Sequence, residues 1–136
     1  MNFSKEKIWF MLCLLLAGSG CSSTRQYDGV ERPSSELAIL IRHEDGYIRK
    51  IDGKWRGIGN IKQYNFLPGK HTLMVDWWPI GSFYRSAHDI ILSVDLKPGH
   101  TYDLIFTADI AKKEWNAFVK DAATGEIVSQ KLLHDS

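Results

Sequence analysis

Apolar and polar residues alternate over most of the chain after Leu37, and this period limits the possible folds more than any other feature of the sequence. The segment 88–96 shows it most clearly. Its apolar positions are Ile90, Leu92, Val94 and Leu96, with Ser93 and Asp95 among the residues between them. Successive side chains of a β-strand point to opposite faces. A period of two therefore predicts strands with one buried face.

Segments of this kind recur along the chain, with turn residues between them. They are 37–41, 47–51, 61–67, 71–77, 88–96, 101–108, 115–120 and 127–132. No interval between them is long enough for a crossover helix. The sequence therefore predicts an all-β domain over residues 37–134, folded as a single antiparallel β-sandwich of seven to eight strands. Segment 109–115 is expected to be a hairpin loop, with one helical turn as the alternative.

Two kinds of turn separate the strands. Asp52-Gly53 is among the strongest short hairpin signals. Pro68-Gly69 and Pro98-Gly99 each stand shortly before a strand, where Pro presets its own φ and Gly accepts a positive φ. We expect the two Pro-Gly turns to form two hairpins that turn in the same way.

The first 20 residues have the pattern of a secretory signal. Met1 to Lys7 carries two lysines, and the ten uncharged apolar residues Ile8 to Ala17 precede the small residues 18–20. Ten residues of helix rise about 15 Å, whereas a bilayer core is about 30 Å thick. A permanent transmembrane helix is therefore disfavoured.

The end of this segment, Leu16 to Cys21, resembles the lipobox of bacterial lipoprotein signals. That resemblance implies that Cys21 is the first mature residue and carries a lipid that holds the protein on a membrane. Ser22, in place of Asp, implies sorting to the outer membrane, on the side that faces the periplasm. The alternatives are an ordinary cleaved signal with an incidental Cys21, or an uncleaved anchor.

Removal of residues 1–20 changes the cysteine and charge counts. Cys13 is lost with the signal and Cys21 is used by the lipid, so the domain has no cysteine for a disulfide, a thiol nucleophile or a zinc site. Lys and Arg fall from 17 to 15, and Asp and Glu fall from 16 to 15. A neutral chain is not expected to bind nucleic acid. Residues 21–36 are mostly polar and are expected to form a flexible linker.

Three short motifs resemble the PEGA-type and related small β-sandwich modules of bacterial surface lipoproteins. They are Ile51-Asp52-Gly53-Lys54, Leu67 to Val75, and Leu96 to Leu104. The resemblance covers about residues 37–106. It implies a sandwich of immunoglobulin-like or PEGA-like type, in an envelope module that does not catalyse a reaction.

Searches for catalytic and metal-binding patterns lead to the same expectation. The five histidines form no His-x-x-x-His or His-Glu-x-x-His spacing, and no serine lies in a Gly-x-Ser-x-Gly motif. We therefore expect no catalytic residues, no metal and no cofactor. His71 and His100 follow the two Pro-Gly turns and are candidates for a pH-sensitive pair. An enzyme with a site assembled from His and Asp on several loops is the minor alternative.

The segment Trp77 to Ser86 is unusually rich in aromatic residues. Trp77 fits the core, whereas Trp78, Phe83 and Tyr84 fall on or beside a loop broken by proline and glycine. Exposed aromatic residues in such a loop often mark a binding surface. The candidate binding residues are Trp55, Arg56, Trp78, Phe83, Tyr84 and Arg85. Their expected ligand is another envelope protein; the alternatives are a glycan or small ligand bound by the same loop, or a loop that only covers the core.

Overall fold

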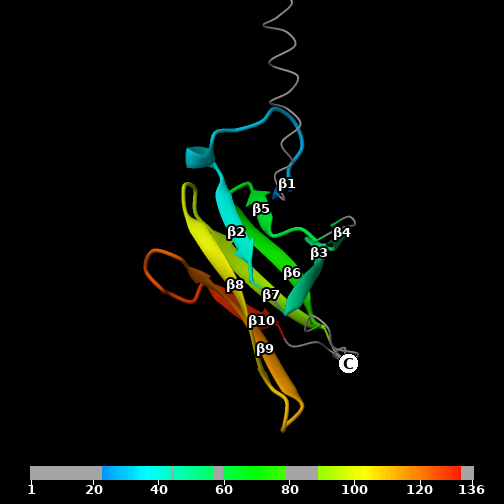
Figure 1. The fold of residues 1–136 in the computed structure, drawn as a ribbon. Helices are drawn as coiled ribbons and strands as arrows, with labels where there is room; N and C mark the ends of the chain where they lie inside the picture. Colours follow the sequence, from blue (N-terminus) through cyan, green and yellow to red (C-terminus); the bar gives the residue numbers. More distant parts are fainter. Residues whose placement is uncertain (1–22, 44, 57–59, 79–88, 133–136) are drawn as a thin grey trace, which may run out of the picture.

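A computed structural model of the chain describes residues 23–43, 45–56, 60–78 and 89–132. These residues form ten strands and one short 3-10 helix (Figure 1). The elements are β1 (Ser23–Arg25), the 3-10 helix η1 (Ser34–Glu36), β2 (Ala38–Arg42), β3 (Gly46–Ile51), β4 (Lys54–Trp55), β5 (Gln63–Phe66), β6 (Gly69–Trp77), β7 (Ile90–Leu96), β8 (Thr101–Asp109), β9 (Glu114–Asp121) and β10 (Ser129–Leu132).

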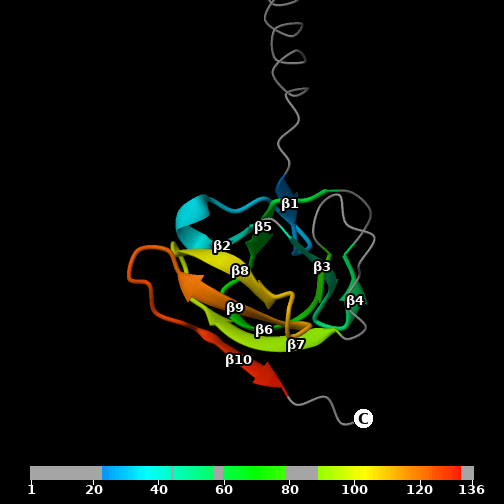
Figure 2. The same ribbon diagram turned by 60° about the horizontal axis from the view of Figure 1, so that its bottom comes forward.

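The strands form two five-stranded sheets that face one another (Figure 2). One sheet has the order β1-β5-β2-β8-β9, and the other has the order β10-β7-β6-β3-β4. The predicted all-β sandwich is confirmed. The structure differs in detail: β1 and β4 were not expected, and the β1–β5 and β2–β8 pairs are parallel.

One apolar core fills the space between the sheets. It contains Ile90, Leu92, Val94 and Leu96 of β7, the apolar positions that the sequence pattern predicted. Its buried members are Ala38, Leu40, Ile48, Ile51, Tyr64, Phe66, Leu73, Val75, Ile90, Leu92, Val94, Leu96, Tyr102, Leu104, Ala117 and Val119. Trp77 is also buried, at 7% exposed, as expected for a core residue. Burial of apolar area at about 25 cal/mol per Å² is the main force that holds the two sheets together.

Two of the predicted hairpins are present. β3 and β4 pair across Asp52 and Gly53, whose φ values of 51° and 76° suit a two-residue turn of the kind that Asp-Gly favours. β8 and β9 pair as far as Asp109 and Glu114. Segment 109–115 is therefore a hairpin loop between two strands, as expected, and not a helical turn.

The Pro-Gly turns do not form hairpins, so that prediction was wrong. The turn at Pro68 leads from β5 in one sheet to β6 in the other, and the turn at Pro98 leads from β7 back to β8. β6 pairs instead with β3 and β7. The alternating pattern shows which face of a strand is buried but not which strand lies beside it, and this explains the error.

The segment expected to be a flexible linker contains regular structure. β1 runs parallel to β5, with Ser23 beside Gln63 and Arg25 beside Asn65. The backbone N–H of Gln26 donates to the Asn65 carbonyl at 2.8 Å. Helix η1 follows, and Leu37 is then buried. In the described part of the chain, no helix is long and apolar enough to span a membrane.

The β8–β9 hairpin extends beyond its sheet and forms the lower end of the molecule in Figure 1. β2 pairs with β8 only as far as Leu104, whereas β8 and β9 continue together to Asp109. Where the hairpin leaves the sandwich, the Phe106 ring lies against Gly46. A Cβ added to Gly46 would come within 2.2 Å of that ring, so a larger residue there would force the ring to move.

Candidate functional site

A groove is formed by β3, β4 and the C-terminal end of β6. It has a volume of about 420 Å³. Its aromatic and cationic lining consists of Tyr47, Arg49, Trp55, Arg56 and Trp78, and we call it the aromatic groove. The Trp55 side chain is 64% exposed and Trp78 is 45% exposed, which is unusual for the largest apolar side chains.

A β-bulge in β3 places part of this lining. Ile48 pairs with Val75 and Lys50 pairs with Met74, so Arg49 is an extra residue in β3. Bulges of this kind redirect side chains and are frequent next to functional sites. Ile48 and Ile51 are three positions apart, so a regular strand would place them on opposite faces, yet both are buried. That break in the period of two is the sequence signal that predicts the bulge.

Aromatic and charged side chains in the groove hold one another in place. The Tyr47 and Trp78 rings meet edge to face, with centroids 6.1 Å apart. The Arg49 guanidinium forms an ion pair with Asp89 at 3.0 Å. The buried Asp76, from β6, forms part of the groove wall. The groove therefore combines apolar ring surfaces with fixed charges.

Arg56 connects the groove to the interior. Its Nε donates to the Ile48 carbonyl, while its Nη1 is buried with no hydrogen-bond partner among the residues that the structure describes. The fully buried Tyr64 lies near this guanidinium and that of Arg42. Burial raises the pKa of Tyr64, although Arg56 and Arg42 act in the opposite direction. The phenol is therefore neutral at physiological pH.

Arg42 contacts the groove residue Tyr47 and was not singled out by the sequence analysis. It is only 7% exposed, and its guanidinium lies 5.0 Å from the centre of the Tyr47 ring. Nε donates to the Ile61 carbonyl at 2.9 Å, Nη1 to the Gly46 carbonyl at 2.6 Å, and Nη2 to Asn60 Oδ1. Arg42 follows Ala38 and Leu40 at every second position of β2. This alternation is the sequence signal that would have placed Arg42 on the inward face.

The structure brings together three of the six predicted binding residues. Trp55, Arg56 and Trp78 all line the aromatic groove. Phe83, Tyr84 and Arg85 lie outside the described residues, as does the lipidation candidate Cys21. The sequence analysis missed Tyr47, Arg49 and Asp76.

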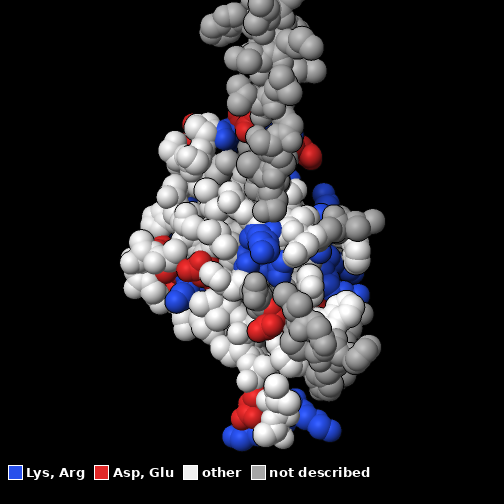
Figure 3. Space-filling view, viewed as in Figure 1, with Lys and Arg blue, Asp and Glu red and all other residues white. Residues whose placement is uncertain are grey.

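Lysine and arginine also gather near the groove. Figure 3 shows their atoms in the middle and on the right of the face that carries β3, β4 and β5. Lys54 in β4 and Lys62 before β5 are both exposed. A ligand with negatively charged or hydrogen-bonding groups would therefore be attracted to this side of the domain.

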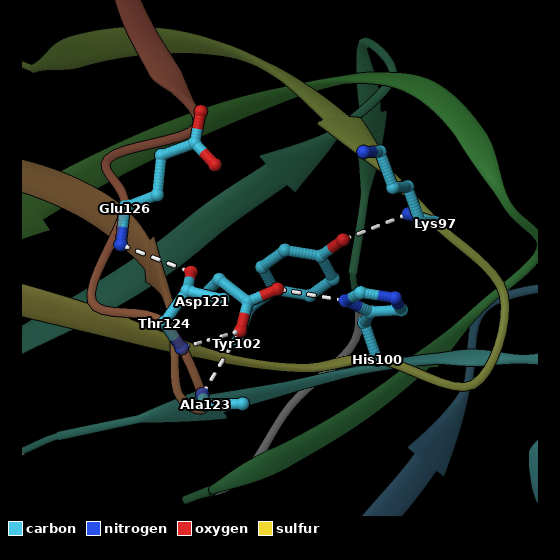
Figure 4. Close-up of polar contacts among 7 residues, drawn as sticks. All are labelled: Lys97, His100, Tyr102, Asp121, Ala123, Thr124 and Glu126. Carbon is cyan, nitrogen blue, oxygen red and sulfur yellow. Dashed lines mark hydrogen bonds and ion pairs between the residues drawn. The ribbon is translucent and has the colours of Figure 1, made fainter.

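The histidines expected as a pair each contact an aspartate instead. His71 Nδ1 lies 2.7 Å from Asp52 Oδ2, and its Nε2 lies 2.6 Å from the Leu67 carbonyl. His100 Nδ1 lies 2.7 Å from Asp121 Oδ2 (Figure 4). These contacts connect each histidine to a turn of the chain.

Asp121 is the centre of the contacts in Figure 4. Its Oδ1 accepts the backbone N–H groups of Ala123 and Thr124 at 2.9 and 3.2 Å. The hydrogen bond from His100 lowers the pKa of Asp121 most; burial opposes that shift, and the two backbone hydrogen bonds add to it. Because these contacts stay within the chain, we assign Asp121 to the stability of its turn.

A third pair, His43 and Asp103, has a contact of 2.9 Å and lies partly exposed. Among residues 23–43, 45–56, 60–78 and 89–132, no three His, Cys, Asp or Glu side chains come close enough to hold a metal ion. The three His–Asp contacts are therefore separate pairs, each of which connects two segments of the chain.

No family model, curated protein or solved structure matches the chain. The resemblances to lipoprotein signals and to PEGA-type modules therefore stay predictions that rest on the sequence motifs.

Proposed function

We propose that this protein is a lipid-anchored, non-catalytic component of the bacterial envelope that binds another envelope component through the aromatic groove. The observation that carries the proposal is the exposure of Trp55 and Trp78 around Arg56. The lipobox-like segment that ends at Cys21 supports the anchor. We place the protein on the outer membrane, facing the periplasm.

Another envelope protein is the ligand that we favour. Trp, Tyr and Arg are the residues that most often dominate the binding energy of protein interfaces. The groove contains all three types, and Arg42 and the Asp89 ion pair hold part of it in place. Such a surface loses little side-chain entropy when a partner binds.

A glycan is the second candidate, and the concave shape of the groove favours it. Aromatic faces beside fixed hydrogen-bonding groups are typical of pockets for small polar ligands. Tyr47, Trp55 and Trp78 supply the faces, and Arg49, Arg56 and Asp76 supply the polar groups. The side chains of the groove are compatible with either ligand, a protein or a glycan, so the experiment below distinguishes the two.

Alanine substitution of Trp55 and Trp78 tests the groove. After crosslinking in the native envelope, we expect the double variant to recover at least tenfold less partner protein, because the two exposed rings are the main contacts of the groove. Ile110→Ala is the matched control, because Ile110 is 79% exposed and lies at the tip of the β8–β9 hairpin. Loss of retention on envelope glycans, with partner recovery unchanged, would support the glycan instead. Full recovery of both would refute a role for the groove.

The anchor has a separate test. Cys21→Ser removes the proposed lipid attachment site, so the variant should leave the membrane fraction. Membrane fractionation measures this directly. A variant that stays with the membranes would contradict the lipoprotein assignment, whatever the groove does.

A further inference from the structure

We infer that the domain rests directly against the bilayer, with the edge that carries β1 facing the lipid. This inference rests on the proposed lipid at Cys21. The sequence alone predicts a linker over residues 21–36, and a flexible chain of about 15 residues has a reach of about 20 Å. In the structure, β1 already begins at Ser23, so the connection between the lipid and the domain is much shorter than the sequence predicts.

Covalent geometry gives the upper limit of the separation. Two peptide units join Cys21 to Ser23, and each extends the chain by at most about 3.6 Å. The start of β1 therefore lies within about 7 Å of the lipidated residue. A domain held this closely has little freedom to move away from the membrane surface.

Backbone pairing attaches β1 to the sandwich, and further contacts order the segment that follows β1. Three residues of β1 pair with β5, and Gln26 adds a backbone bond to Asn65. Tyr27 packs under the Arg25 guanidinium, 5.3 Å from it, and its hydroxyl accepts the backbone N–H of Arg32 at 3.1 Å. The chain then enters η1 and the buried Leu37.

The position of β1 also sets the orientation of the domain. β1 is the edge strand of one sheet, and β10 is an edge strand of the other. Figure 2 shows β1 at the top of the molecule and β10 at the bottom. With the β1 edge against the bilayer, β10 faces away from it and stays accessible from the aqueous side.

Two insertions distinguish this arrangement from a flexible linker. A Gly-Ser insertion of 12 residues before Ser23 lengthens the connection between the lipid and β1. The same insertion after Val30, which is 87% exposed, lengthens only the chain between β1 and η1. The first should move the domain away from the bilayer by about 20 Å, and the second should leave its distance unchanged.

The measurement uses the chain from Cys21 to Ser136, which contains every described residue and a single cysteine. Its thiol is coupled to a maleimide lipid in a supported bilayer of phosphatidylethanolamine and phosphatidylglycerol, and neutron reflectometry gives the distance of the protein layer. Equal shifts for both insertions would show that β1 detaches, and no shift for either would show that another surface holds the domain. Either result overturns the inference. Because the coupling is chemical, neither result depends on lipidation in the cell, which Cys21→Ser tests.

Discussion

The Asp121 turn and the aromatic groove both contain aromatic and charged side chains, but they use them differently. In the turn, Asp121 is only 6% exposed and accepts bonds from His100 and from two backbone N–H groups. In the groove, Trp55 and Trp78 keep much of their surface in water. Polar contacts that end within the chain stabilise the fold, whereas exposed rings beside fixed charges offer contacts to another molecule.

Two arginines at the groove differ in how they are placed. Arg42, which contacts Tyr47 of the groove, is buried and bonds to three acceptors in the chain. Arg49, within the groove, is 39% exposed and forms one ion pair. Arg42 therefore supports the groove, whereas Arg49 lines it. The predictions below test this difference.

The largest expected effect is that of Arg42→Met. The substitution keeps an apolar stem but leaves the Gly46 and Ile61 carbonyls without their donor. We expect the free energy of unfolding to fall by about 3–5 kcal/mol, measured by urea denaturation. Arg49→Met, the matched control, should lower it by less than about 1 kcal/mol, because partly exposed ion pairs contribute little. Equal effects would contradict the distinction between support and lining.

The Asp121 turn should lose stability in acid. The pKa of Asp121 is lower in the folded protein than its ordinary value of 3.8, so its carboxylate stabilises the fold above about pH 4. That contribution is lost as the pH falls through the folded-state pKa. We expect Asp121→Asn to unfold at lower urea than the wild type at pH 7, with a difference that shrinks below pH 4. A difference that is constant with pH would contradict this assignment.

The smallest effect on stability is expected for the groove tryptophans. Trp55→Ala and Trp78→Ala should each lower the free energy of unfolding by less than about 1 kcal/mol, because both rings are already partly in water. Urea denaturation of each variant checks this. A larger loss would identify the rings as part of the fold and would weaken the binding assignment.

The sequence predicted the two-layer β fold because a period of two depends only on burial. The inward residues of β7, Ile90 to Leu96, are where the pattern placed them. β1 was missed because Ser23, Thr24 and Arg25 form a short edge strand without an apolar face. The Pro-Gly turns were assigned to hairpins because local turn chemistry does not show whether the next strand stays in the same sheet.

The candidate site was predicted in part for related reasons. Trp55, Arg56 and Trp78 were found because large aromatic residues next to turn signals are visible in a sequence. Tyr47 and Arg49 were missed because their position depends on the bulge in β3 and on its pairing with β6. A site assembled across neighbouring strands becomes visible only when the register is known.

Site-specific photocrosslinking in the native envelope tests the central claim most directly. A photoreactive aromatic residue at Trp55, which lines the groove, reports on the groove, and one at Ala123 reports on the Asp121 turn; both positions are exposed. We predict that position 55 forms a covalent adduct with an envelope component and that position 123 does not. An adduct from position 123 with none from position 55 would contradict the assignment of the aromatic groove as the binding surface.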